Sequence, residues 1–183
     1  MKFKFPLLVA LSLCVYAAVN AQKPIPRTDV ILDNAYKQAK LENKRVFVIF
    51  HASWCVWCHK MDSSMNDISC KKMFQDNYVT CHLTVDESKD KKDLETPDAD
   101  AFRAKYHGET AGLPFWLIFD NTGKLLADSR MRKTDDGPDA PGDNMGCPAS
   151  TDEVAHFIKI LSATSKLSDQ QLRVIQERFS KNK

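Results

Sequence analysis

Two unbroken apolar runs, residues 46–50 and 115–119, dominate the hydrophobic pattern of the chain. Neither run shows the polar alternation of a half-exposed strand, so both predict central strands that are covered on both faces of a sheet. Residues 79–85 alternate instead, with Val, Cys, Leu and Val at the odd positions, which indicates a strand with one buried face. Turn-forming residues at 120–123 precede a second arm at 124–129 and predict a hairpin.

Helical patterns occupy most of the remaining chain. Apolar residues at i, i+3, i+4 spacing predict helices at 28–43, where Thr28 and Asp29 can act as caps, at 67–76 and at 98–106. A charged linker is expected at 87–95 as a solvated loop.

Two capping boxes predict the last helices, because each places a serine three residues before Glu or Gln. They are Ser150-Thr151-Asp152-Glu153 and Ser168-Asp169-Gln170-Gln171. The breaker-rich residues 131–150 in front of them predict an irregular loop. The succession of helices and strands is that of one α/β domain.

The N-terminus is predicted to be a secretory signal peptide spanning residues 1–21. Lys2 and Lys4 precede an apolar stretch at 7–19, and small residues up to Ala21 suit cleavage. The stretch is shorter than the roughly 20 residues that a membrane-spanning helix needs. We therefore expect an exported, periplasmic or secreted protein without stable membrane insertion after cleavage.

Charge and cysteine count narrow the function further. Removal of residues 1–21 leaves 24 basic and 24 acidic residues, so no basic excess points to nucleic acid. Five cysteines remain, in a compartment that tolerates disulfides. Because five is odd, at least one thiol is free or pairs outside the chain, which suits redox chemistry better than a disulfide-stapled scaffold.

The candidate chemistry lies in Trp54-Cys55-Val56-Trp57-Cys58-His59, directly after the first apolar run. Two cysteines three residues apart at the start of a helix lie on the same face, where exposed N–H groups and the helix dipole favour a thiolate. The letters C-x-x-C-H also match a covalent haem site. The preceding buried strand and the bulky Trp57 between the cysteines favour a redox dithiol, and no cofactor or metal is expected.

The chain resembles the thioredoxin-fold family, and in particular exported bacterial thioredoxin-like proteins with a W-C-x-W-C active site. The resemblance spans about residues 29–161. It is carried by the strand at 46–50, Ala52-Ser53-Trp54-Cys55-Val56-Trp57-Cys58, the strand ending in Val85-Asp86, and Leu113-Pro114 before the hairpin that begins at Phe115. It implies an α/β thioredoxin-like fold with a central mixed sheet flanked by helices. The domain would occupy residues 22–183, with a core at about 28–163 and an additional C-terminal helix at 166–180.

The resemblance also implies roles for individual residues. Cys55 would be the nucleophile and Cys58 the buried resolving thiol, forming the Cys55–Cys58 disulfide. Pro114 would be cis and packed against the dithiol, and Leu113 would offer backbone groups to a substrate strand. Trp54 and Trp57 are interpreted as an apolar, substrate-facing rim, although core packing is an alternative for Trp54.

One departure from the family pattern concerns the proton of Cys58. Many thioredoxins carry a buried aspartate six residues before the first cysteine, and here that position is Ile49. The lysine that often partners the acid matches His82, so His82 is a candidate proton relay, with an ordinary strand residue as the alternative. His59, four residues after Cys55, could support the thiolate or be an ordinary surface residue.

The other cysteines leave several alternatives open. Cys70 and Cys81 both fall on predicted inward faces, as inert core thiols or as a second disulfide. Cys147, just before a helix, is either an auxiliary redox thiol or a loop cysteine. Aspartates at 135–143 lack the EF-hand spacing expected of a calcium site.

The sequence therefore predicts a thiol–disulfide oxidoreductase that exchanges disulfides with protein thiols and disulfides of the cell envelope and with an unidentified redox partner. A thioredoxin-fold binding or chaperone-like module with an idle dithiol is the rival interpretation.

Overall fold

The computed structural model describes residues 24–132, 137 and 140–182. The helices are α1 (Thr28–Glu42), α2 (Val56–Met65), α3 (Lys71–Asn77), the short 3₁₀ helix η1 (Lys89–Leu94), α4 (Ala99–Lys105), α5 (Thr151–Thr164) and α6 (Asp169–Phe179). The strands are β1 (Arg45–His51), β2 (Tyr78–Thr84), β3 (Phe115–Phe119), β4 (Leu125–Asp128), β5 (Arg130–Met131) and β6 (Asp143–Asn144).

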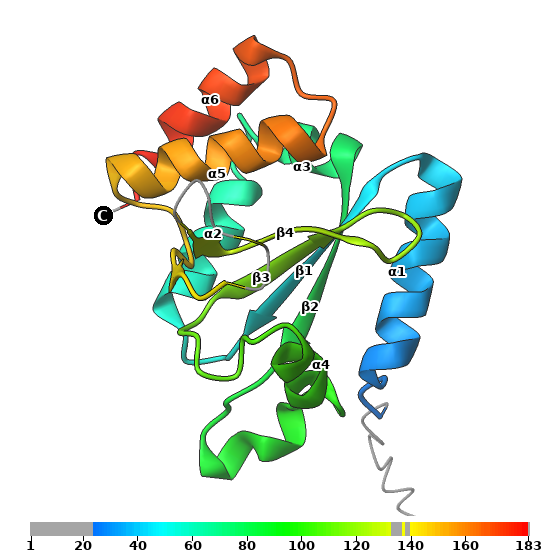
Figure 1. The fold of residues 1–183 in the computed structure, drawn as a ribbon. Coiled ribbons are helices and arrows are strands. Elements are labelled where there is room, and N and C mark those ends of the chain that lie inside the picture. The colour runs from blue at the N-terminus through cyan, green and yellow to red at the C-terminus, as the bar shows by residue number, and fades with distance from the viewer. Residues whose placement is uncertain (1–23, 133–136, 138–139, 183) are drawn as a thin grey trace, which may run out of the picture.

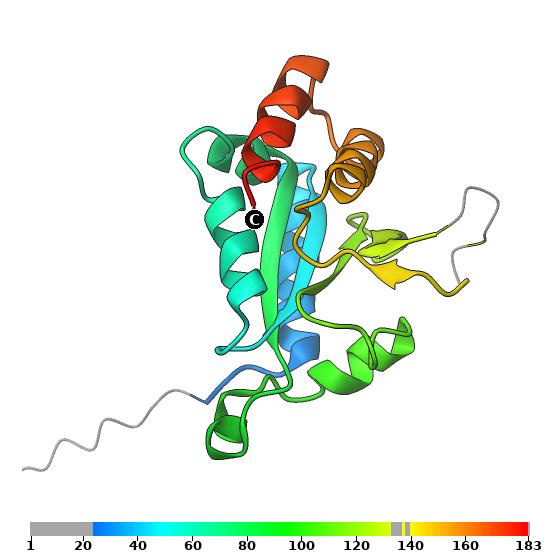
Figure 2. The same cartoon turned by 90° about the vertical axis from the view of Figure 1, so that its left-hand side faces the viewer.

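A four-stranded mixed sheet forms the centre of the fold, in the order β2-β1-β3-β4. Strand β1 runs parallel to β2 and antiparallel to β3, and β3 pairs antiparallel with β4. The short strands β5 and β6 form a separate hairpin that projects from the sheet (Figure 2). The thioredoxin-like fold with a central mixed sheet is thereby confirmed.

Helices cover both faces of this sheet, which explains why the central strands are continuously apolar. Val46, Val48 and Phe50 of β1 pack into one core together with α1 and α4. Phe47 and Ile49 pack into the opposite core, against α2, α3, α5 and α6. Figure 1 shows α1 on one side of the sheet and α2, α5 and α6 on the other, and in Figure 2 α1 lies behind the strands.

Most of the predicted elements are confirmed, including both capping boxes. The side chain of Ser150 accepts a hydrogen bond from the backbone N–H of Glu153 at the start of α5, and Ser168 does the same with Gln171 at the start of α6. The residues of β1 and β3 between the strand ends are fully buried, as their apolar runs predicted.

Three local predictions are wrong. The cap residue of α1 is Arg27, which makes no side-chain cap, and the Thr28 hydroxyl instead donates to the carbonyl of Pro97 at 2.8 Å. The helix predicted from residue 67 begins at Lys71, because the Asp67 carboxylate accepts the N–H of Ser69 and closes a turn. The loop expected at 131–150 contains the last residue of β5 and the whole of β6.

Two groups of predicted features lie outside the described residues. They are the signal peptide at 1–21 and the aspartates at 135, 136 and 139. Among the helices that the structure does describe, none combines the length and hydrophobicity of a membrane span.

Candidate active site: a disulfide at the start of α2

Cys55 and Cys58 form a disulfide at the N-terminus of α2, with 5.2 Å between their Cα atoms. Cys55 is the N-cap residue, and its Sγ accepts the backbone N–H of Cys58 at 3.1 Å. Both are buried in this oxidised form, with 3% exposure for Cys55 and 1% for Cys58. A sulfur that already accepts a helix N-terminal N–H is placed where a thiolate would be stabilised after reduction.

Apolar side chains stand exposed around the buried disulfide. Trp54, Val56 and Trp57 are 57%, 64% and 42% exposed. The ammonium group of Lys60 lies over the ring of Trp57, 4.2 Å from its centroid. Core packing therefore does not account for Trp54, and three neighbouring apolar side chains form an accessible rim beside the sulfurs.

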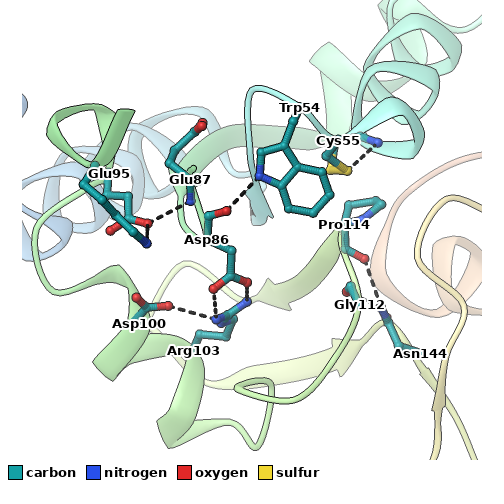
Figure 3. Close-up of polar contacts among 12 residues, drawn as sticks. Trp54, Cys55, Asp86, Glu87, Glu95, Asp100, Arg103, Gly112, Pro114 and Asn144 are labelled. Atoms are coloured by element: carbon teal, nitrogen blue, oxygen red, sulfur yellow. Dashed lines mark hydrogen bonds and ion pairs between the residues drawn. A yellow bond between two sulfur atoms is a disulfide. The ribbon is translucent and has the colours of Figure 1, made fainter. Parts of the chain in front are cut away.

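The loop before β3 lies against the disulfide. The Leu113–Pro114 peptide bond is cis, as predicted, and Leu113 packs against the small cluster of Ala52, Cys55 and Cys58. Asn144 of β6 holds this loop from the other side, because its side-chain amide donates to the carbonyls of Gly112 at 2.6 Å and Pro114 at 3.2 Å (Figure 3). The β5–β6 hairpin thus supports the cis-proline loop, a role that its sequence did not indicate.

The turn that leads into Cys55 is held by Glu87, which the sequence placed in a solvated loop. That prediction is wrong, because Glu87 is only 4% exposed. Its carboxylate accepts the backbone N–H of Ser53 at 2.5 Å and the Ser53 hydroxyl at 2.8 Å. Burial acts to raise the pKa of Glu87, but these two hydrogen bonds, together with the nearby Lys91 and His51, outweigh it and hold that pKa below its ordinary value.

His59 fixes the same turn from within α2. Its Nε2 lies 3.0 Å from the carbonyl oxygen of Ser53, so Nε2–H is the donor. His59 is exposed, as the surface alternative expected, and its ring is held by the backbone before Cys55. Ser53 is bound through its N–H, its hydroxyl and its carbonyl, by residues from two separate segments.

Two histidines lie together on the face of the sheet that α2 covers. His82 of β2 is paired in register with Ile49 of β1, and its Nε2 lies 2.8 Å from the carboxylate of Asp62 on α2. The ring of His51, at the end of β1, lies edge-on to that of His82 with 5.1 Å between centroids. Burial, and next the neighbouring His82, lower the pKa of His51. Asp62 follows Cys58 by one helical turn.

The alternative of a Cys70–Cys81 disulfide is wrong. Both cysteines are free, and they lie on opposite sides of the sheet. Cys70 belongs to the core under α2 and α3, whereas Cys81 packs against the core under α1. Burial raises the pKa of both thiols, that of Cys81 to about 12.

Cys147 is also a buried thiol, 4% exposed, rather than an accessible one. Its Sγ accepts the side-chain amide of Asn182 at 3.4 Å, and the same amide donates to the carbonyl of Pro148. Burial raises the pKa of Cys147 to about 12. A thiol that stays protonated is a poor nucleophile, so the raised pKa favours the alternative of a loop cysteine over an auxiliary redox thiol for Cys147.

A helix that begins with a disulfide and faces a cis-proline loop defines the thioredoxin class of redox proteins. The model of a family described as thioredoxin-like matches residues 29–121, which is about half of the chain. The chain therefore belongs to the thioredoxin-like family. Comparison with curated proteins finds no match.

Solved structures to which this chain is similar include the disulphide isomerase from Xylella fastidiosa Temecula1. It is 17% identical, with 94% of this chain and 98% of that chain covered and a TM-score of 0.47. The C-terminal domain of Neisseria meningitidis DsbD in its oxidised form is also 17% identical, over 58% of this chain and 84% of that chain, with a TM-score of 0.41.

Among the described residues, no group of three or more His, Cys, Asp or Glu side chains is arranged to hold a metal ion.

Proposed function

We propose that the protein is an exported thiol–disulfide oxidoreductase that exchanges disulfides with protein substrates through Cys55 and Cys58. The observation that carries the proposal is the Cys55–Cys58 disulfide at the N-terminus of α2, packed against the loop of Pro114. Structural disulfides do not need a helix N-terminus or an exposed aromatic rim, but a dithiol that exchanges with other proteins gains from both.

The reaction is a pair of exchanges at sulfur. In the reduced protein the Cys55 thiolate attacks one sulfur of a substrate disulfide, forming a mixed disulfide and releasing one substrate thiolate. The Cys58 thiolate then attacks Sγ of Cys55, which forms the intramolecular disulfide and releases the second substrate thiolate. In this direction two electrons pass from the dithiol to the substrate, and a dithiol of the redox partner returns them. The same two exchanges run in reverse when the oxidised Cys55–Cys58 pair takes electrons from a substrate dithiol, and the proposal covers both directions.

We assign Cys55 the attacking role because it is the cap residue whose sulfur receives the helix N–H. Cys58, one turn further into α2 and 1% exposed, is suited to an attack that occurs inside the protein. The rim of Trp54 and Trp57 would contact the substrate, and the backbone around Leu113 would receive its extended chain. The signal-like residues 1–21 support export to the periplasm or beyond.

A rival function is that of a binding or chaperone-like module whose disulfide does not turn over. The exposed apolar rim would serve both functions, so the distinction lies in the chemistry of the sulfurs. Reduction of insulin by dithiothreitol, followed by turbidity, separates the two. We expect the parent protein to accelerate it and Cys55→Ser to abolish the acceleration.

Cys58→Ser provides the matched control, because it keeps the nucleophile and removes the resolving thiol. When the reduced variant is mixed with insulin in the absence of dithiothreitol, Cys55 should attack an insulin disulfide and remain joined to one insulin chain. This mixed disulfide is visible on a non-reducing gel, and Cys55→Ser should not form it. Equal rates of insulin reduction by the parent and by Cys55→Ser would refute the proposed oxidoreductase activity. N-terminal sequencing of the protein from the envelope fraction tests export, and an intact Met1 would contradict it.

A further inference from the structure

A buried arginine lies behind the residues that precede the dithiol. Arg103 of α4 is 4% exposed, and its guanidinium donates to both carboxylate oxygens of Asp86, at 2.6 and 3.0 Å. A third hydrogen bond of 2.9 Å joins it to Asp100, one turn earlier in α4 (Figure 3). A two-pronged contact of this kind fixes the orientation of a carboxylate as well as its position.

The segment that Arg103 holds is in direct contact with the rim of the active site. Asp86 has a left-handed backbone with φ of 53°, and its carbonyl accepts the indole N–H of Trp54 at 2.8 Å. The next residue is Glu87, which binds the turn at Ser53. Figure 3 shows the continuous path from Arg103 through Asp86 to Trp54, beside Cys55.

We infer that Arg103 is a positioning residue that acts through Asp86 to hold the indole of Trp54 ready for protein substrates. The inference rests on the proposed function, and it adds a determinant of substrate affinity that lies away from the sulfurs. Trp54 is 57% exposed, and its hydrogen bond to the Asp86 carbonyl restricts the orientation of the ring. An aromatic side chain that is already ordered loses less entropy when a partner binds it.

The effect should appear in substrate binding and not in the exchange step. Trp54 contacts the substrate through its ring, whereas bonds form and break at Cys55 and Cys58. Contacts of equal strength in the bound complex and in the transition state change KM and leave kcat unaltered. A disulfide too small to reach the rim should not depend on Trp54 at all.

Asp86→Asn and Asp100→Asn form a matched pair for the test. Each removes one negative charge from the same buried guanidinium, which donates two hydrogen bonds to Asp86 and one to Asp100. Only Asp86 connects Arg103 to Trp54. Asparagine is also among the residues that tolerate the left-handed backbone at position 86, which keeps the loop conformation accessible.

The assays are reduction of insulin over a range of concentrations and single-turnover reaction of the reduced protein with bis(2-hydroxyethyl) disulfide, a small disulfide without aromatic rings. For Asp86→Asn we expect a two- to tenfold rise in KM for insulin, the size of one weakened hydrogen bond, with kcat and the small-disulfide rate within twofold of the parent. Asp100→Asn should match the parent in the KM for insulin, in kcat and in the rate with the small disulfide.

A second measurement does not depend on activity. The indole N–H resonance of Trp54, assigned by its loss in Trp54→Phe, should exchange with solvent faster in Asp86→Asn than in the parent or Asp100→Asn. Unchanged KM and unchanged indole exchange in Asp86→Asn would overturn the inference, as would equal effects of the two variants. A parent that reduces neither disulfide would instead refute the proposed function.

Discussion

Replacing Glu87 by glutamine should destabilise the protein in a pH-dependent way. The carboxylate is 4% exposed and accepts two hydrogen bonds from Ser53, the residue two positions before Cys55. A glutamine can keep both contacts, with its carbonyl on the Ser53 N–H and its amide on the Ser53 hydroxyl, so the substitution removes the negative charge while preserving the shape. The difference between parent and Glu87→Gln therefore measures the charge.

The magnitude follows from the strength of charged and neutral hydrogen bonds. Bonds to a charged group contribute about 1.5–3 kcal/mol and neutral ones about 0.5–1.5 kcal/mol, so two bonds lose about 2–3 kcal/mol in total. Burying an amide costs less desolvation free energy than burying a carboxylate. This smaller cost offsets part of the lost hydrogen-bond strength. We expect Glu87→Gln to lower the free energy of unfolding by about 1–2 kcal/mol at pH 7.

The sign of the pH dependence follows from the lowered pKa of Glu87 in the folded protein. Its stabilising contribution is complete above the unfolded glutamate pKa of about 4.3 and is lost as the pH falls through the folded value. Urea denaturation at several pH values between 7 and 3 should show the parent losing its advantage over Glu87→Gln in that acidic range.

Glu109→Gln is the control for this measurement, because Glu109 is exposed and the substitution changes the net charge by the same amount. It should leave the unfolding free energy within about 0.5 kcal/mol of the parent. A parent–Glu87→Gln difference that stays constant from pH 7 to pH 3, or that equals the Glu109→Gln effect, would refute the reasoning.

Two further predictions concern the reactivity of the Cys147 thiol and the transfer of the Cys58 proton. A thiol reagent applied to the reduced, folded protein should modify Cys147 at least about tenfold more slowly than Cys55, as mass spectrometry of peptides can show, because burial raises the pKa of Cys147 to about 12. Rapid labelling of Cys147 would contradict its placement in the core. If His82 relays the proton of Cys58 through its contacts with Asp62 and His51, His82→Ala should shift the pH profile of mixed-disulfide resolution. Identical pH profiles for the parent and His82→Ala would refute the role of His82 as a proton relay.

The sequence was sufficient where local pattern determines structure. The apolar runs at 46–50 and 115–119 could only be covered on both faces, and Ser150 and Ser168 cap helices through contacts three residues away. The C-x-x-C spacing together with Leu113-Pro114 located the dithiol and the loop opposite it.

Contacts between distant segments were beyond these patterns. Nothing in the charged stretch at 87–95 indicates that Glu87 folds back onto Ser53 while its neighbours remain in solvent. An inward-facing helix residue and an inward-facing strand residue can also face different sides of one sheet, which is why Cys70 and Cys81 were wrongly considered as partners. Strands of two residues, such as β6, have no periodicity to detect.

Helices α5 and α6, which follow the residues matched by the family model, determine how far the chain can be shortened. The family match ends at residue 121, yet Phe157 and Leu161 of α5 and Ile175 and Phe179 of α6 fill the core on which α2 rests. A fragment that stops at the family boundary would expose the apolar underside of the helix that carries Cys55 and Cys58. We therefore expect a fragment that folds on its own and keeps the dithiol buried to extend beyond the family region and through α6.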